Sequence, residues 1–446
     1  MSADKRYEGQ SVLILGLGVS GKAAAQFLLK RGAQVTGVDQ QVELMRQHPE
    51  IQELQDLGLS PMSESQVSPS AFNLVVASPG ISPTHPLYRA AQEEQIELIG
   101  EAELAFRSLR VPCLAVTGSN GKTSTVLLTA HVLNQSGIAA KALGNVGRPL
   151  TKGLDELNGE VVIVELSSWQ LETLSSRVVD AAVILNMTPN HLDRHGNMET
   201  YVSAKLNLIR CLKPGRSLYM GMSANKEFAH LIHPFQPITF GYELDAMVHC
   251  DQEFIRLKEN IEFQIPPVYR GKISHEIENM MASYVLCREV GIAPQQFLNA
   301  FATFQKPPHR IEFVRVVCGV SYYDDSKASS VDAVIKAVLS LKGSIFLIAG
   351  GVHKGASYVP WIKAFEGRVC AVCAIGQAAS LIQAEIGADV PVVSFSTLEE
   401  AVNFAAAHAS PGDHVLLSPG CASFDMFCDY KHRGKEFKRL VCGLED

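Results

Sequence analysis

The chain has 446 residues, with 47% hydrophobic and 19% charged residues and a formal net charge of −7. At ordinary domain size this length predicts about three domains, and the composition is typical of globular domains with substantial cores. The negative charge argues against general binding to nucleic acid or to an anionic membrane surface, because both ligands are polyanions.

The N-terminal ten residues are polar and do not resemble a secretory signal. No apolar run reaches the roughly 18–20 residues that span a bilayer. The ten cysteines lack regular spacing, which is typical of free thiols in a reducing cytosol. Cys370 and Cys373 have CxxC spacing, but they lie in an apolar run without a second pair, so we expect a structural strand and not a zinc site. We therefore expect a cytoplasmic protein.

Short apolar runs alternate with helical patterns along almost the whole chain. Such alternation predicts an α/β fold with parallel sheets that helices cover on both faces. The predicted strands are Val12–Leu15, Gln34–Val38, Leu74–Ala77, Leu114–Thr117, Val161–Glu165, Ala181–Asn186, Ile345–Ala349, Val369–Ile375 and Val415–Ser418.

Two breaks predict domain boundaries. Near Glu97–Phe106 a helical stretch leads into a new strand and a second glycine loop, and near residues 306–309 two consecutive prolines stop a helical region. The predicted domains are therefore residues 1–98, 99–306 and 307–446.

The first motif is a glycine loop between the strand Val12–Leu15 and a helix over Ala23–Lys30. Gly16, Gly18 and Gly21 have the GxGxxG spacing, and the next strand ends in Asp39. Glycines permit a tight turn and a close approach of backbone N–H groups to phosphate. The spacing leaves open whether the ligand is NAD or another diphosphate.

The second motif is more specific. Residues 114–124 read as a strand, a glycine loop and a helix start, with Lys122 and Thr123 after Gly121. Val116 replaces the first glycine of the usual G-x4-G-K-[ST] spacing. Backbone N–H groups still cradle phosphate, the lysine reaches the terminal phosphates, and the threonine hydroxyl can bind Mg²⁺.

Two further strands end in polar residues. Glu165 ends the apolar strand Val161–Glu165, where a carboxylate needs either a metal ion or an ion-pair partner. His191 follows the next strand in a polar loop that suits metal or phosphate chemistry, although an ordinary loop histidine is equally compatible. Lys205, on the next helix, is expected from its pattern alone to be solvent-exposed.

The C-terminal third contains four polar clusters, each at an end of a predicted strand. Arginine and lysine in such clusters clamp carboxylate or phosphate, although any one cluster could be a surface loop. The clusters are Pro308–Glu312, Tyr322–Ser330, Ala349–Gly355 and Leu417–Asp425.

Over essentially its whole length the sequence resembles the Mur ligases. The string Glu165–Glu172 is the most discriminating part of the match. The other matching segments are Gly16–Gly21, Ser78–Ile81, Thr117–Thr123, Gly144–Asn145, Asn186–Arg194, His309–Arg310, Asp325–Lys327 and Ser418–Asp425. The resemblance implies an N-terminal Rossmann-like domain, a central P-loop ATPase-like parallel sheet and a C-terminal Rossmann-like domain.

The resemblance also implies an activity. It is the ATP- and Mg²⁺-dependent addition of D-glutamate to UDP-N-acetylmuramoyl-L-alanine through an acyl phosphate, a step of cytoplasmic peptidoglycan precursor synthesis. The implied partners are these small molecules, with no nucleic acid or membrane, and the implied protein is a monomer.

Residue roles follow from the same resemblance. The UDP substrate would contact Gly16, Gly18, Gly21, Asp39 and Gly80. ATP would contact Gly118, Ser119, Asn120, Gly121, Lys122, Thr123, Ser124, Asn145, Asn279, His309, Arg310, Asp325 and Lys327. The amino acid would contact Ser329, Lys354, Ser423 and Tyr430.

The implied catalytic residues are Lys122, Glu165, His191 and Lys205. Thr123 and Glu165 would bind one Mg²⁺, and His191 and Lys205 a second. Lys205 stands where these ligases carry a lysine carbamylated by CO₂. Carbamylation needs a neutral amine, so we expect a pKa below the ordinary lysine value of about 10.4.

Several positions depart from the family pattern. Gln40–Gln41 replaces common uracil-contacting residues, Glu276 replaces an asparagine near ATP, and His353 stands where aspartate is frequent. Ser329–Ser330 replaces Thr-Asn, and Tyr430 replaces a phenylalanine. None of these changes removes a proposed metal or phosphoryl-transfer group.

Three alternatives remain at this point. One is another amide ligase of the same superfamily, such as a folylpolyglutamate-type enzyme. An NAD-dependent oxidoreductase would use Gly16–Gly21 but would leave Thr117–Thr123 without a role. A non-catalytic nucleotide-binding protein would result if Glu276 blocked ATP.

Overall fold

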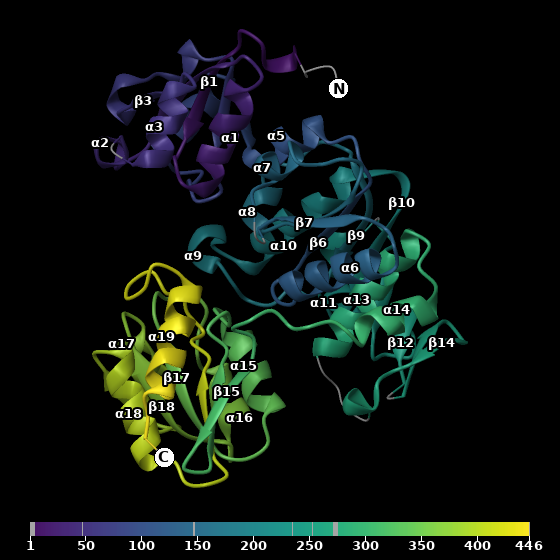
Figure 1. Ribbon diagram of the computed structural model, residues 1–446, viewed down its shortest axis with the longest axis vertical. Coiled ribbons are helices and arrows are strands. Elements are labelled where there is room, and N and C mark those ends of the chain that lie inside the picture. Colours follow the sequence, from purple (N-terminus) through teal and green to yellow (C-terminus); the bar gives the residue numbers. More distant parts are fainter. Residues whose placement is uncertain are drawn as a thin grey trace. The chain divides into compact units, whose positions relative to one another are not determined.

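The computed structural model describes residues 5–46, 48–145, 148–233, 235–251, 253–270 and 275–445 (Figure 1). By contacts the chain divides into two compact units. The first unit consists of Met1–Asn186 and Val202–Phe304, and the second of Met187–Tyr201 and Gln305–Asp446. The first unit holds two sheets and the second holds one, so the predicted α/β fold with three domains is confirmed.

The N-terminal sheet is five-stranded and parallel throughout, in the order β3-β2-β1-β4-β5. Its strands are β1 Ser11–Leu15, β2 Gln34–Val38, β3 Ser60–Met62, β4 Leu74–Ala77 and β5 Glu97–Gly100. The helices of this domain are α1 Val19–Leu29, α2 Val42–Met45, α3 Pro49–Asp56 and α4 Pro86–Glu93.

Alternate residues of β1 belong to two different hydrophobic cores. Val12 and Ile14 pack with residues of α1 and α3, whereas Leu13 and Leu15 pack with residues of α4. Successive side chains of a strand point to opposite faces, so a continuous apolar run requires helices on both faces. This explains why the unbroken apolar runs in the sequence predicted β1, β2 and β4, whereas β3 and β5 were not predicted.

The predicted helical stretch at Glu97–Phe106 is partly wrong. Glu97–Gly100 is strand β5, and helix α5 covers only Glu101–Ser108. Leu98 and Ile99 pair in parallel with Val75 and Val76 of β4, so long-range pairing outweighs the local helical pattern.

The central sheet has nine strands, in the order β14-β13-β12-β11-β10-β9-β6-β8-β7. The strands are β6 Cys113–Thr117, β7 Ala140–Gly144, β8 Val161–Glu165, β9 Val179–Ile184, β10 Leu212–Gly221, β11 Ile238–Gly241, β12 Val248–Cys250, β13 Phe254–Leu257 and β14 Asn260–Gln264. Strands β6 to β12 pair with one another in parallel, whereas β13 pairs antiparallel with β12 and with β14. The sequence did not predict this antiparallel extension.

The central region also contains eight helices among the described residues. They are α6 Lys122–Gln135, α7 Leu150–Leu154, α8 Ser168–Leu171, α10 Met198–Leu206, α11 Met222–Glu227, α12 Ala229–Ile232, α13 His275–Glu289 and α14 Pro294–Phe301. A large core joins α6 and α13 to strands β6, β8 and β9. The carboxyl ends of β6, β8 and β9 therefore lie side by side, which is where parallel sheets place ligands.

The sheet of the second unit has the order β15-β16-β20-β17-β18-β19 and is parallel except for the antiparallel edge strand β15. Its strands are β15 Glu312–Val317, β16 Val320–Asp324, β17 Ile345–Gly350, β18 Val369–Ile375, β19 Val392–Phe395 and β20 His414–Leu417. The helices are α15 Val331–Ser340, α16 Pro360–Phe365, α17 Ala379–Ile386, α18 Leu398–His408 and α19 Tyr430–Cys442. The short helix α9 Leu192–His195 also belongs to this unit.

The prediction for Cys370 and Cys373 is confirmed in its main point. Both residues lie in β18, Cys373 is buried and Cys370 is exposed, and all ten cysteines are free thiols. Within the described ranges, no helix combines the length and the apolar character that a membrane span requires.

Candidate functional site

The loop between β6 and α6 needs glycine at two positions. Gly118 and Gly121 have φ angles of 149° and 87°, which residues with a Cβ rarely adopt. A Cβ on Gly121 would lie 2.2 Å from Asn279 Oδ1, and one on Gly118 would lie 2.9 Å from the Cβ of Leu185. Backbone geometry and space therefore both explain the glycines in the predicted phosphate loop.

Hydrogen bonds fix this loop against the end of β9. Ser119 N donates to Asn186 O at 2.9 Å, and Asn120 N donates to Asn186 Oδ1 at 2.8 Å. Asn186 Nδ2 donates in return to Asn120 O at 3.1 Å. The loop is thus preorganised by the asparagine that opens the Asn186–Arg194 segment.

Two lysines meet at one carbonyl of the loop. Lys122, the first residue of α6, donates to Gly118 O at 2.8 Å and to Ser119 O at 2.9 Å. Lys205 of α10 donates to the same Gly118 O at 2.9 Å. The loop therefore brings the amino groups of Lys122 and Lys205 together where parallel strands end and where a helix N-terminus favours anions.

Lys205 is buried, with only 2% of its surface exposed, so the expectation of a solvent-exposed helix lysine is wrong. Burial lowers the pKa of Lys205 well below its ordinary value, the Lys122 ammonium lowers it further, and the Glu165 carboxylate opposes both effects. The expected depression of this pKa is confirmed. A neutral amine is the form that reacts with CO₂.

Glu165 lies at the end of β8 and is 2% exposed. Its Oε1 accepts a hydrogen bond from Asn145 Nδ2 at 2.9 Å, whereas its buried Oε2 has no hydrogen-bond partner among the described residues. An unsatisfied buried carboxylate oxygen is costly, and a bound cation would satisfy it. Glu165 therefore fits the predicted role of a Mg²⁺ ligand. Thr123, the second predicted ligand of this ion, follows Lys122 in the first turn of α6 and is partly buried.

The predicted UDP-binding residues also come together. Gly16 has a φ of 84°, and a Cβ on Gly21 would lie 1.8 Å from Gly16 O. Asp39 accepts hydrogen bonds from Leu17 N at 2.9 Å and from Gln41 N at 3.0 Å. Gly18 and Gly80 are exposed in the loops after β1 and β4, which are neighbouring strands. The N-terminal domain thus has two neighbouring glycine-containing loops at the carboxyl end of its sheet.

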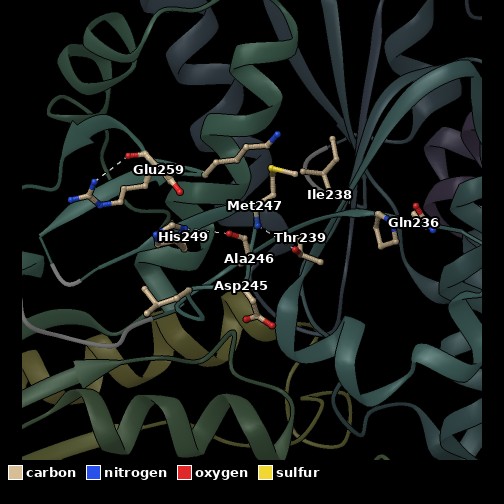
Figure 2. Close-up of a pocket in the computed structure, with 12 residues that line it drawn as sticks. Gln236, Ile238, Thr239, Asp245, Ala246, Met247, His249 and Glu259 are labelled. Carbon is tan, nitrogen blue, oxygen red and sulfur yellow. Dashed lines mark hydrogen bonds between the residues drawn. The ribbon is translucent and has the colours of Figure 1, made fainter.

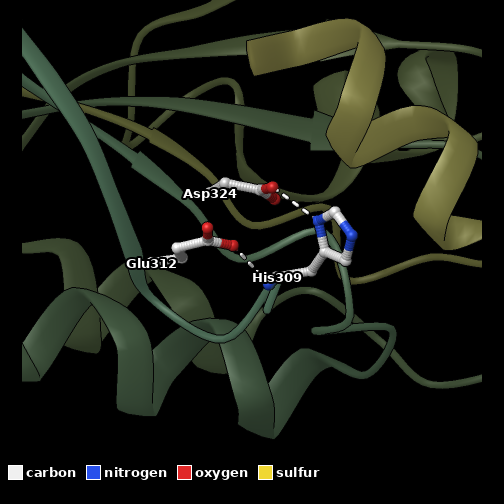
Figure 3. A group of neighbouring side chains, drawn as sticks. All are labelled: His309, Glu312 and Asp324. Carbon is white, nitrogen blue, oxygen red and sulfur yellow. Dashed lines mark hydrogen bonds and ion pairs between the residues drawn. The ribbon is translucent and has the colours of Figure 1, made fainter. Parts of the chain in front are cut away.

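His309 of the second unit is held by two carboxylates, as Figure 3 shows. His309 Nδ1 and Asp324 Oδ2 are 2.6 Å apart, and His309 N donates to Glu312 Oε2 at 2.8 Å. Lys438 lies 2.6 Å from Glu312 Oε1 and 3.8 Å from Asp324 Oδ2. His309, Glu312 and Asp324 have the donor set of a metal site, but an ammonium already pairs with both carboxylates, so we assign no metal there.

Asp325 is 6% exposed and lies beside this cluster. Burial raises its pKa to about 7, although the hydrogen bond from Ser418 and the charge of Arg310 oppose the rise. Asp325 Oδ2 accepts from Ser418 Oγ at 2.8 Å, and Oδ1 accepts from Ile311 N at 3.2 Å. Asp325 thereby joins the loop after β16 to the loop after β20.

The second unit holds four of the residues predicted for ATP and all four predicted for the amino acid, whereas the remaining predicted ATP residues lie in the first unit. Lys327 Nζ lies 4.1 Å from the centroid of the Tyr430 ring, and the His309 ring meets the same tyrosine edge-on at 6.0 Å. Lys354 Nζ donates to Ser329 Oγ at 2.9 Å. Ser423 is buried in the neighbouring loop after β20.

His191 also belongs to the second unit. It has a φ of 57° and directly precedes helix α9. A Cβ on Gly355 would lie 2.8 Å from Asp193 N, so the loop that carries Lys354 packs closely on the His191 segment.

The structure also gives roles to residues to which the sequence assigned none. Asn186, Lys438 and Arg433 all bond to residues of the predicted site or to the loops that carry them. For Asn186 the signal was its place at a strand end. Lys438 and Arg433 lie on α19, far along the chain from their partners, and no local pattern marks them.

A cavity of about 770 Å³ lies elsewhere, beside the antiparallel extension of the central sheet. Figure 2 shows Thr239 of β11, Met247 before β12, His249 of β12 and Glu259 of the turn between β13 and β14 around it. It contains none of the residues predicted for ATP, the UDP substrate or the amino acid, and we assign it no role in the reaction.

Comparisons with known proteins agree with the three-domain fold and with the order of the predicted domains. Family models described as Mur ligase MurD-like N-terminal domain, Mur ligase middle domain and Mur ligase glutamate ligase domain match residues 10–100, 116–287 and 309–421. A protein of Protochlamydia amoebophila named UDP-N-acetylmuramoylalanine--D-glutamate ligase is 47% identical over 98% of this chain and 99% of its own length. A protein of the same name from Chlamydia caviae is 34% identical, over 98% of both chains.

Among solved structures, the MurF ligase of Thermotoga maritima in complex with ADP superposes with a TM-score of 0.62. It covers 98% of this chain and 96% of that chain at 16% sequence identity. At this identity the likeness establishes the fold alone.

Proposed function

This chain belongs to the Mur ligase family, and we propose that it joins D-glutamate to UDP-N-acetylmuramoyl-L-alanine at the expense of ATP. The geometry of the glycine-lysine loop carries the proposal, because Lys122 and Lys205 converge on Gly118 O beside the buried carboxylate of Glu165. The names of the relatives that match over nearly the whole chain support the choice of substrates.

The reaction requires two transfers. A carboxylate oxygen of the UDP substrate attacks the γ-phosphorus of ATP, the bond to the β–γ bridging oxygen breaks, and ADP leaves. The D-glutamate amine then attacks the acyl carbon, the acyl–phosphate bond breaks, and phosphate leaves with the formation of an amide and the loss of a proton. Both steps depend mainly on positioning and electrostatic stabilisation.

The first unit supplies the groups for the phosphoryl transfer. Backbone N–H groups at the start of α6 face the glycine loop, and the Lys122 ammonium offsets charge on the transferred group. Thr123 and Glu165 would hold Mg²⁺, which when bound supplies further charge neutralisation. The unsatisfied Oε2 of Glu165 is the feature of the structure that supports this assignment.

Lys205 is proposed to carry a carbamate. Its neutral Nζ would attack CO₂, a C–N bond would form and a proton would be lost, which gives an anionic group with two oxygens. The burial of Lys205 and its depressed pKa support this step. The assignment of His191 together with Lys205 to a second Mg²⁺ remains a prediction from the sequence.

The second unit is proposed to contribute His309, Arg310, Asp325 and Lys327 to ATP. Ser329, Lys354, Ser423 and Tyr430 are proposed to receive D-glutamate. The hydrogen bond from Lys354 to Ser329 supports a shared site for a carboxylate, because both side chains are donors that could turn to one anion. We place the reaction in the cytoplasm, where ATP is available.

Replacement of Lys122 tests this proposal. Purified full-length wild type and Lys122→Ala are given ATP, Mg²⁺, UDP-N-acetylmuramoyl-L-alanine and D-glutamate, and the amide product and ADP are quantified. We expect product from the wild type, little ADP when D-glutamate is omitted, and a loss of at least about a hundredfold in the variant. Unchanged product formation by Lys122→Ala would refute the role of the loop.

A further inference from the structure

Arg433 is one of the most deeply buried charged residues of the second unit. It lies in the first turn of α19 and is 1% exposed. A guanidinium in such a place ordinarily pairs with a carboxylate, because burial of an unpaired charge is costly. No carboxylate forms an ion pair with Arg433 among the described residues, so its charge is stabilised in another way.

All of its hydrogen bonds go to neutral oxygens of two loops. Arg433 Nε donates to Ser326 Oγ at 3.0 Å, and Nη2 donates to Ser326 O at 2.8 Å. Nη1 and Nη2 each lie 3.3 Å from Cys421 O. The planar fork of one arginine therefore spans the loop after β16 and the loop after β20.

Both loops carry residues with proposed ligand roles. Ser326 stands between Asp325 and Lys327 on the nucleotide side, and Cys421 is two residues before Ser423 on the amino-acid side. Ser326 Oγ also donates to Tyr430 O at 2.8 Å, which ties the start of α19 to the same point. Burial lowers the pKa of Arg433 to about 10, so the guanidinium remains charged at neutral pH.

We propose that Arg433 is a positioning residue that aligns the nucleotide side and the amino-acid side of the second unit with each other. The inference rests on the proposed function for the identity of the two ligands, and it goes beyond that function by assigning one buried side chain to both sites. Because one fork bonds to both loops, removal of Arg433 displaces both groups of ligand contacts together. Removal of a residue that merely fills space would lower stability without this paired effect.

Two replacements separate the effect of the guanidinium hydrogen bonds from the effects of the positive charge and of the side-chain volume. Arg433→Lys keeps a positive charge but cannot bond to both loops with a planar fork, and Arg433→Met keeps the length without donors. Phe437→Leu is the matched control, because Phe437 lies one turn further along α19, is fully buried and touches neither loop by a hydrogen bond in the described structure. Each full-length variant is measured for KM of ATP, KM of D-glutamate, kcat and thermal midpoint.

We expect both arginine variants to raise both KM values by about tenfold or more. Phe437→Leu should lower the thermal midpoint while both KM values stay within about twofold of wild type. Unchanged KM values, a rise in only one of them, or KM changes equal to those of Phe437→Leu would each overturn the inference. Failure of both arginine variants to fold would also overturn it, since Arg433 would then be a folding residue.

The activity of the wild type distinguishes a failure of this inference from a failure of the proposed function. If the wild type forms no product with D-glutamate, the proposed function fails. The inference is then tested by equilibrium binding of ATP to the wild type and to the three variants, where only the arginine variants should bind more weakly. Equal ATP affinity in all four proteins would overturn it.

Discussion

Replacement of Gly121 by alanine should damage the phosphate loop in a way that another glycine replacement does not. Gly121 has a φ of 87°, and the left-handed conformation costs a residue with a Cβ about 1–2 kcal/mol. The new Cβ would lie 2.2 Å from Asn279 Oδ1, which accepts a hydrogen bond from Thr125 Oγ1 at 3.3 Å. Asn279 must therefore move, and the buried bond is lost.

Gly137, just after the other end of α6, is the matched control. Its φ of 84° gives the same backbone strain, but no described atom lies within 4 Å of the position of a new Cβ. The difference between Gly121→Ala and Gly137→Ala therefore isolates the clash with Asn279. Loss of a hydrogen bond, with buried groups left unsatisfied, predicts a further destabilisation of about 1–3 kcal/mol.

Urea unfolding midpoints and the rate of ATP-dependent amide formation measure this difference. We expect Gly137→Ala to retain nearly full activity with a modest loss of stability. Gly121→Ala should unfold at lower urea than Gly137→Ala and lose at least about tenfold in rate, because the clash with Asn279 disturbs the packing that holds the phosphate loop in place. Equal midpoints and equal rates for the two variants would refute the role given to close packing at Gly121.

Three further predictions concern buried ionisable side chains. The folded state raises the pKa of Asp325 to about 7, above its unfolded value of about 4. The stability of wild type relative to Asp325→Asn should therefore fall as pH rises from about 4 to about 7. A difference in urea midpoint between the two proteins that does not change with pH would contradict this. Lys205→Met replaces a buried amino group by an apolar side chain of similar length, and we expect a thermal midpoint equal to or above that of wild type together with loss of product formation. A stable, fully active variant would exclude a catalytic role for Lys205. Asp324→Asn removes the carboxylate that pairs with His309 and leaves Lys438 paired with Glu312 alone, so it should lower unfolding stability by about 1–3 kcal/mol and raise KM for ATP. An unchanged KM would show that the orientation of His309 does not matter for binding.

The sequence predicted those structural features that depend on local sequence patterns. Strands Val161–Glu165 and Val369–Ile375 have the predicted bounds, because unbroken apolar runs report burial on both faces of a sheet. Gly118 and Gly121 were found because a loop between a strand and a helix admits few other residues at positive φ. The buried position of Glu165 followed in the same way from its place at a strand end.

Long-range contacts were not accessible from local patterns. Lys205 has the pattern of an ordinary helix lysine, but in the folded chain it is buried and bonds to the phosphate loop, which is 87 residues away along the chain. Lys438 and Glu312 are 126 residues apart, so their pairing beside His309 depends on how α19 packs on β15 and β16. The antiparallel strand β13 is short and has little period-two alternation, and its pairing with β12 and β14 decides its structure.

Mass spectrometry of the products formed from a panel of amino acids tests the proposed activity most directly. Wild-type protein is incubated with ATP, Mg²⁺ and UDP-N-acetylmuramoyl-L-alanine, together with each L- or D-amino acid in turn. We predict one new amide, formed with D-glutamate and in a one-to-one ratio with ADP. An amide formed preferentially with another amino acid, or rapid ADP release without any amide, would contradict the proposed function.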